Sequence, residues 1–145
     1  MKLAILITHL VFVGLWLGCV LTEALFERAL LGQGRDKEKI LANLHKRVDA
    51  IVEIPAFLVV LVTGAVLFAR SDLTLLLITK ASFGVVAILA NIYCVHLVFQ
   101  RADCALKDDW KGFERIDHLQ HKYGAVVLVG ILGALFTGLY MSVAN

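Results

Sequence analysis

Four long apolar stretches take up most of this 145-residue chain and decide what it can fold into. They cover residues 3–22, 50–69, 73–99 and 123–144. About 20 helical residues, each rising about 1.5 Å, cross the hydrocarbon core of a membrane. The chain is 60% hydrophobic, well above the share of roughly half that is typical of soluble domains. We therefore predict an all-α integral membrane protein, a single-domain bundle of four helices over residues 1–145 that run alternately up and down.

Basic residues gather in two of the three segments that connect these stretches. Most of the 14 lysines and arginines lie there, and short basic loops remain in the cytoplasm. We expect a multi-pass protein of the inner (plasma) membrane with both termini outside. Because the loops explain the formal charge of +2, we expect membrane lipid and no nucleic acid as a partner. Gly14 and Gly18 form a G-x-x-x-G pattern that allows close helix packing or a homodimer.

The connections between the stretches predict local features of the bundle. Gly32 and Gly34 are expected to end the first helix, because glycine favours the conformation of a helix C-terminus. The link at residues 70–72 is so short that the second and third helices should be antiparallel neighbours. Pro55 should kink the second helix.

Acidic and histidine residues lie near the loop ends of all four stretches. If each hairpin is symmetric about its turn, counting outward from the turn gives the depth of each side chain. One level then contains one residue from each helix, Glu23, Asp49, His96 and His121. A second level, one helical turn nearer the loops, contains Glu27, His45 and His118. Glu53 follows Asp49 at a spacing of i+4, which keeps both on one face of the second helix.

These two levels predict a metal centre, because ionisable groups at membrane depth are costly and usually mark a functional site. Four-helix bundles hold dinuclear centres with carboxylate and histidine ligands from facing helices. Such ligands suit divalent iron, zinc or manganese, so we predict a dinuclear non-haem centre. The predicted ligands are Glu23, Glu27, His45, Asp49, Glu53, His96, His118 and His121. The structural alternative is that these residues pair with neighbouring Lys and Arg at the interface, and Asp117 is expected to solvate the second loop.

A metal centre in a membrane bundle suggests an oxidoreductase that exchanges electrons with a quinone or an electron-transfer partner. The sequence contains no nucleotide-binding motif. Two alternatives stay open. One is a haem b protein with His9, or a pair among His45, His96 and His121, as axial ligands. The other is a metal transporter or sensor in which the acidic and histidine residues form a transit site.

Short motifs in three of the helices resemble a known group of membrane proteins. These are the stretch around His9 and Trp16, Asp49 with Glu53 and Pro55, and Lys80 at the start of the third helix. In this order they resemble the small HemJ and CopD-type membrane proteins, which are respectively haem-associated protoporphyrinogen oxidases and proteins of copper handling. The resemblance implies cofactor-binding roles for His9, as a haem ligand, and for Lys80. The other histidines do not belong to the HemJ pattern, which implies a second or different cofactor site.

Overall fold

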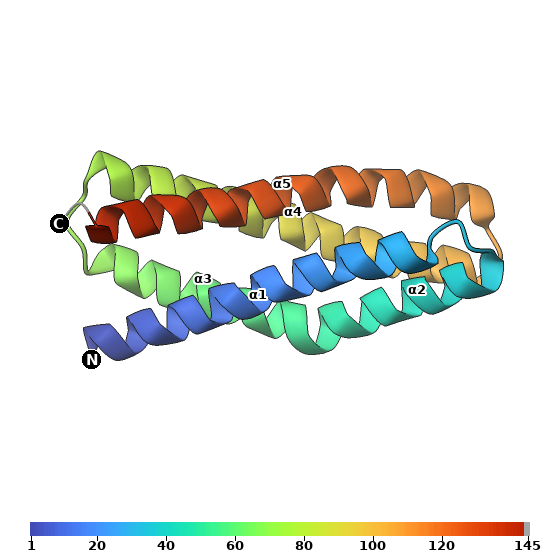
Figure 1. Ribbon diagram of the computed structural model, residues 1–145, viewed down its shortest axis with the longest axis horizontal. Coiled ribbons are helices and arrows are strands. Elements are labelled where there is room, and N and C mark those ends of the chain that lie inside the picture. The colour runs from blue at the N-terminus through green and yellow to red at the C-terminus, as the bar shows by residue number, and fades with distance from the viewer. Residues whose placement is uncertain (144–145) are drawn as a thin grey trace.

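The computed structural model describes residues 1–143, and within that range every element is helical (Figure 1). The elements are α1 (Lys2–Leu30), α2 (Arg35–Val48), the π-helix η1 (Asp49–Glu53), α3 (Ile54–Ala69), α4 (Leu75–Leu106) and α5 (Trp110–Val143). Because α2, η1 and α3 follow one another without a break, the described chain forms four antiparallel rods, which confirms the predicted all-α bundle. The end of the predicted fourth stretch, Ala144, and the last residue, Asn145, lie outside the described residues.

Each rod is long and apolar enough, by length and composition, to cross a membrane. Within residues 1–143 the four candidate spans are Lys2–Leu30, Arg35–Ala69, Leu75–Leu106 and Trp110–Val143. Their outward faces carry many leucines, valines and isoleucines, which is how helices present themselves to lipid. The chain is therefore a multi-pass membrane protein by this criterion.

Two tight turns lie together at one end of the bundle, which we call the loop end. Residues 31–34 turn at Gly32 and Gly34, whose φ angles of 73° and 107° suit glycine, as predicted. The second turn, residues 107–109, ends at Asp109, whose side chain accepts a hydrogen bond of 3.0 Å from the backbone N–H of Gly112 and caps α5. The opposite end, with the N-terminus and the link at residues 70–74, is the terminal end (Figure 1).

The second rod bends where η1 joins α2 to α3 (Figure 1). The backbone N–H of Ile54 bonds to the carbonyl of Asp49, five residues back, which is the wider turn of a π-helix. Pro55, which has no N–H to donate, follows directly and begins α3. The predicted distortion is thus present, and it begins at Asp49 itself and includes Glu53.

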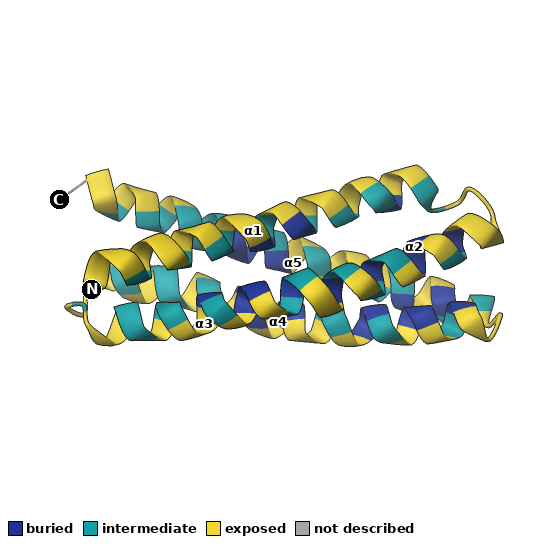
Figure 2. Ribbon diagram, turned by 90° about the horizontal axis from the view of Figure 1, so that it is seen from below, coloured by how far each residue is buried: buried dark blue, intermediate teal, exposed yellow. Residues whose placement is uncertain are grey.

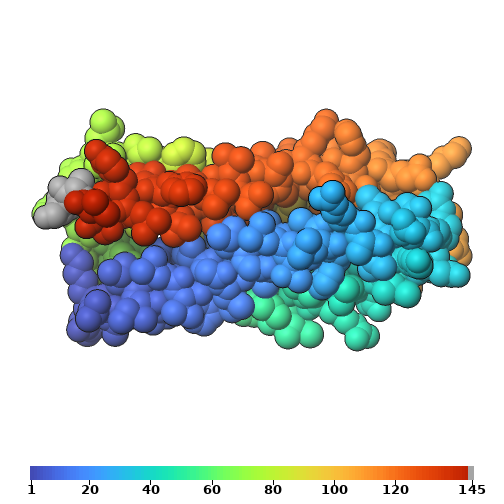
Figure 3. Space-filling view, in the orientation of Figure 1, coloured from blue at the N-terminus to red at the C-terminus, as the bar shows by residue number. Residues whose placement is uncertain are grey.

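The second and third rods are antiparallel neighbours as predicted, and they meet mainly through α2 and α4 and less through α3. The most extensive packing lies elsewhere, between α4 and α5 and between α1 and α3. Glycines on α5 explain its packing with α4, because a Cβ at Gly130 would lie only 2.8 Å from the Cβ of Ala87. Gly14 and Gly18, by contrast, have nothing within 4 Å of such an atom among the described residues. Figure 3 shows α1 and α5 side by side on one face of the molecule.

Buried side chains concentrate in the middle of the bundle and toward the loop end (Figure 2). Within the described chain, no residue before Trp16 in α1 or after Val60 in α3 is buried. The same holds before Ala87 in α4 and after Ile131 in α5, over the range that the structure covers. The terminal end is therefore the looser part, and the loop-end half contains the close packing that can hold polar groups away from water.

Candidate metal centre

Three carboxylates meet inside the loop-end half, and we call them the deep acidic group. Glu23 comes from α1, and Asp49 and Glu53 from η1; one oxygen of each lies within 4.8 Å of the others. Asp49 is 1% exposed and Glu53 3%. The π-helix spaces Asp49 and Glu53 so that both reach the inside of the bundle together with Glu23.

The deep acidic group has little compensation for its charge. The indole N–H of Trp16 donates a hydrogen bond of 3.2 Å to Glu53 Oε1. Glu23 Oε1 and Asp49 Oδ1 are buried and have no hydrogen-bond partner within residues 1–143. No Lys, Arg or His in the described part of the chain forms an ion pair with any of the three. Three like charges held this closely in a low-dielectric interior repel one another strongly unless protons or a cation neutralise them.

A fully buried arginine lies one helical turn nearer the loops. Arg101 in α4 is 0% exposed and donates to Glu27 Oε1 at 2.7 Å and to Asp117 Oδ1 at 2.5 Å. Its other terminal nitrogen donates to His45 Nδ1 at 2.6 Å. Because a guanidinium can only donate, His45 is neutral here with its proton on Nε2. Arg101 thus joins α1, α2 and α5 to α4 through charged hydrogen bonds.

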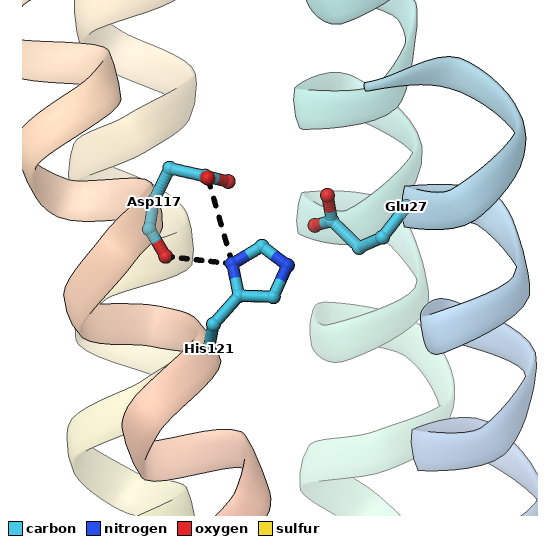
Figure 4. A group of neighbouring side chains, drawn as sticks. All are labelled: Glu27, Asp117 and His121. Carbon is cyan, nitrogen blue, oxygen red and sulfur yellow. Dashed lines mark hydrogen bonds and ion pairs between the residues drawn. The ribbon is translucent and has the colours of Figure 1, made fainter. Parts of the chain in front are cut away.

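A second group of possible ligands lies beside this arginine, nearer the surface of the bundle, and we call it the shallow group. It consists of Glu27, Asp117 and His121, each with one ligand atom within 4.8 Å of the others (Figure 4). The imidazole of His121 is about half exposed, and its Nδ1 lies 2.8 Å from the backbone carbonyl of Asp117 and 3.5 Å from Asp117 Oδ2. Nδ1 therefore carries the proton, which leaves Nε2 available as a ligand atom.

A cavity of about 190 Å³ connects the two groups. Its lining includes all three carboxylates of the deep acidic group, and also Glu27 and His121 of the shallow group. Asn91, with a buried Nδ2 that has no partner among the described residues, also faces this cavity. The space and the oxygen donors together can accept a small hydrated cation.

The structure brings together six of the eight predicted ligands and leaves two outside. Glu23, Asp49 and Glu53 form one group, Glu27 and His121 belong to another, and His45 lies beside Arg101. His96 and His118 are exposed, and His96 bonds only to Gln100, at 3.0 Å, among the residues described. The predicted level with one ligand from each helix is therefore wrong for α4, because equal depth does not fix the direction in which a side chain leaves its helix.

The two residues implied by the family resemblance lie at the terminal end, far from these groups. His9 Nδ1 is 2.8 Å from the hydroxyl of Thr63, and its ring packs over Gly64. The side chain of Lys80 packs over Gly138 in the same way. Both residues are partly buried.

Sequence reasoning missed Arg101 and misassigned Asp117. Arg101 is one of the basic residues that the hydropathy pattern assigns to the second connecting segment, and the expectation that Asp117 solvates this loop is wrong, because its side chain is only 15% exposed and binds Arg101. Counting residues from the turn could have paired Arg101 with Asp117, because both are equally far from Asp109 along the chain and so lie at the same depth. A basic residue at the depth of Glu27 and His45 is a direct candidate for their partner.

Comparisons of the chain with family models, with curated proteins and with solved structures found no match.

Proposed function

We propose that this chain is an integral membrane metalloprotein that binds a divalent cation at the deep acidic group. The observation that carries the proposal is the convergence of Glu23, Asp49 and Glu53 inside the bundle without a basic partner in the part of the chain described. An uncompensated buried charge is strongly unfavourable, whereas a cation bound by several carboxylates removes the repulsion.

A single ion at this position fits the geometry better than a bridged dinuclear centre. The residues predicted for a second layer, Glu27 and His45, already bind Arg101. A guanidinium between them supplies the positive charge that a second metal ion otherwise contributes. Carboxylate oxygens favour hard divalent ions, so manganese and iron are the best candidates and zinc the next.

Manganese and iron both change oxidation state, which supports an oxidoreductase role at this site. In this proposal the ion exchanges electrons with a quinone or an electron-transfer partner that reaches it through the membrane. The distribution of basic residues supports an inner-membrane location with the loop end in the cytoplasm and both termini outside.

The proposal is tested with the full-length protein purified in detergent. Replacement Asp49→Asn should lower the affinity for Mn²⁺ at least about tenfold, since even the loss of an outer partner of a metal ligand costs about that much. Asp36→Asn, an exposed position at the start of α2, is the matched control and should bind like the original chain. Elemental analysis and Mn²⁺ titration followed by electron paramagnetic resonance measure the content and the affinity.

Thermal unfolding with and without metal provides an independent test of the deep acidic group. Without metal, Asp49→Asn should be the more stable protein by about 1–3 kcal/mol, because one buried unpaired charge is gone. At Mn²⁺ concentrations about 100-fold above its dissociation constant the original chain gains about 2.7 kcal/mol, whereas a variant that binds tenfold more weakly gains about 1.4 kcal/mol, so the stability advantage of Asp49→Asn should shrink by about 1.3 kcal/mol. Full metal retention in Asp49→Asn, with the same stability difference with and without Mn²⁺, would contradict the proposed site.

A further inference from the structure

His121 offers a free ligand atom at the outer edge of the cavity. Its Nδ1 donates to the backbone carbonyl of Asp117, four residues earlier on the same helix, at 2.8 Å. This bond fixes the ring orientation and the tautomer, as the outer hydrogen bonds of metal-binding histidines do. The side chain is 47% exposed, so the remaining nitrogen, Nε2, is accessible to a solute.

Glu27 has a carboxylate oxygen without a partner on the opposite side of the same gap. Its Oε1 accepts the hydrogen bond from Arg101, while Oε2 is buried without a partner among residues 1–143. The residue as a whole is only 9% exposed. Figure 4 shows its carboxylate facing the imidazole of His121 across the gap between α1 and α5. A buried carboxylate oxygen with nothing to bind is unfavourable, and a cation in this gap would satisfy it.

Asp117 is the third member of the shallow group, and Arg101 binds only one of its two carboxylate oxygens. Asp117 Oδ1 binds Arg101 at 2.5 Å, whereas Oδ2 does not bind Arg101 and lies 3.5 Å from the protonated Nδ1 of His121. Arg101 thereby holds both carboxylates in place and leaves one oxygen of each free. Two carboxylates, one guanidinium and a neutral imidazole leave one net negative charge to attract a cation.

The shallow group is also connected to the deep acidic group. Glu27 and His121 line the same cavity of about 190 Å³ as Glu23, Asp49 and Glu53. Glu27 and Glu23 are one helical turn apart on α1, about 6 Å along its axis. An ion at the shallow group would therefore need to move only a short distance, between oxygen donors, to reach the deep group.

We infer that Glu27, Asp117 and His121 form a second cation site, an entry site, at which a divalent ion from the solution at the loop end binds first. One nitrogen and two oxygen ligands suit borderline ions such as Zn²⁺, Co²⁺ and Fe²⁺. The site is the weaker of the two because it is open to solvent and Arg101 offsets part of its charge. Its role as an entry site rests on the proposed function of the deep acidic group, whereas its ability to bind a cation depends only on its own three ligands.

The test uses Co²⁺, whose visible absorption reports its ligands, with the full-length protein in detergent. The variant is His121→Ala, and His118→Ala on the same helix is the matched control, because His118 is exposed and lies outside both groups. Equilibrium titration should show a tight and a weak class of site in the original chain. In His121→Ala the weak class should lose at least about tenfold in affinity, and rapid mixing should show loading of the tight class slowed to a similar extent. His118→Ala should match the original chain in both measurements.

The outcomes separate the inference from the proposed function. If His121→Ala matches the original chain in weak binding and in loading rate, the entry site is wrong, whatever Asp49→Asn shows. If Asp49→Asn keeps the tight class while His121→Ala loses the weak one, the shallow group binds cations and the deep assignment fails. If His121→Ala loses weak binding but loads at the original rate, the site exists and its role in entry is refuted.

Discussion

The first half of the chain, through α3, and the second half, α4 and α5, repeat short motifs in the same order. Leu-Ile-Thr precedes His9 near the start of α1 and again precedes Lys80 near the start of α4. A Thr-Gly pair follows in the returning helix of each half, ending at Gly64 in α3 and at Gly138 in α5. Repeats of this kind in membrane proteins are related by an axis along the membrane normal when they run in the same direction.

The contacts at the terminal end confirm that these positions correspond. A Cβ at Gly64 would lie 3.2 Å from Cε1 of His9, and a Cβ at Gly138 would lie 3.1 Å from Cε of Lys80. The threonine before each glycine donates its hydroxyl hydrogen to the carbonyl four residues earlier, at 2.6 Å in α3 and 2.7 Å in α5. Each half therefore closes the same contact within itself.

The loop end shows where the halves differ. Counting from His9 and from Lys80, Glu23 corresponds to Cys94 and Leu30 to Arg101. The first half supplies the whole deep acidic group, and the second half supplies the buried arginine. The first half therefore carries the acidic group and the second half carries the arginine that binds Glu27, so charged contacts join the two halves at the loop end.

The largest effect that tests these contacts should follow from removal of the buried arginine. Arg101→Met leaves the buried carboxylate of Glu27 and the partly buried carboxylate of Asp117 without their partner, which should destabilise the protein by about 3–5 kcal/mol. The matched control is Arg47→Met, at an exposed position, with an expected change within about 0.5 kcal/mol. Thermal unfolding in detergent measures both. Adding Glu27→Gln to Arg101→Met should recover part of the lost stability. Equal melting temperatures for Arg101→Met and the control would show that Arg101 does not stabilise the contact between the two halves.

A smaller effect should follow from substitutions between α4 and α5. A Cβ at Gly130 would lie 2.8 Å from the Cβ of Ala87 and 3.1 Å from its backbone, which cannot move aside as the tip of a side chain can. Gly130→Ala should therefore cost about 1–3 kcal/mol through overpacking. Gly124→Ala is the control on the same helix, because nothing among the described residues lies within 4 Å of the added atom. The same unfolding measurement separates the two, and equal stabilities would mean that the second half is not held together by close backbone contact.

Hydropathy and turn residues were sufficient to predict the four rods, the glycine turn at Gly32 and Gly34, and the distortion near Pro55. These features depend on local chemistry, so the sequence carries them directly. The sequence did not predict that α4 packs more extensively against α5 than against the second rod, because a short link makes two helices neighbours without fixing how closely they pack. The outward direction of His96 was missed for a related reason, since depth along a helix leaves rotation about its axis undetermined.

The smallest effects should come from the terminal end, where the halves correspond most closely. In Lys80→His the imidazole would lie beside Thr137 as His9 lies beside Thr63, so the free energy of unfolding should change by less than about 1 kcal/mol in the same thermal measurement.

His9→Ala should leave Mn²⁺ binding at the deep acidic group unchanged, because His9 and Glu23 are about 21 Å apart along α1 at about 1.5 Å per residue. The same samples test the haem alternative through their visible spectra. A Soret band in the original protein that disappears in His9→Ala and persists in Lys80→His would establish His9 as a haem ligand and a second cofactor at the terminal end. Loss of both the Soret band and Mn²⁺ binding in His9→Ala would mean that the two ends are coupled, and the independence of the terminal-end contacts would be disproved.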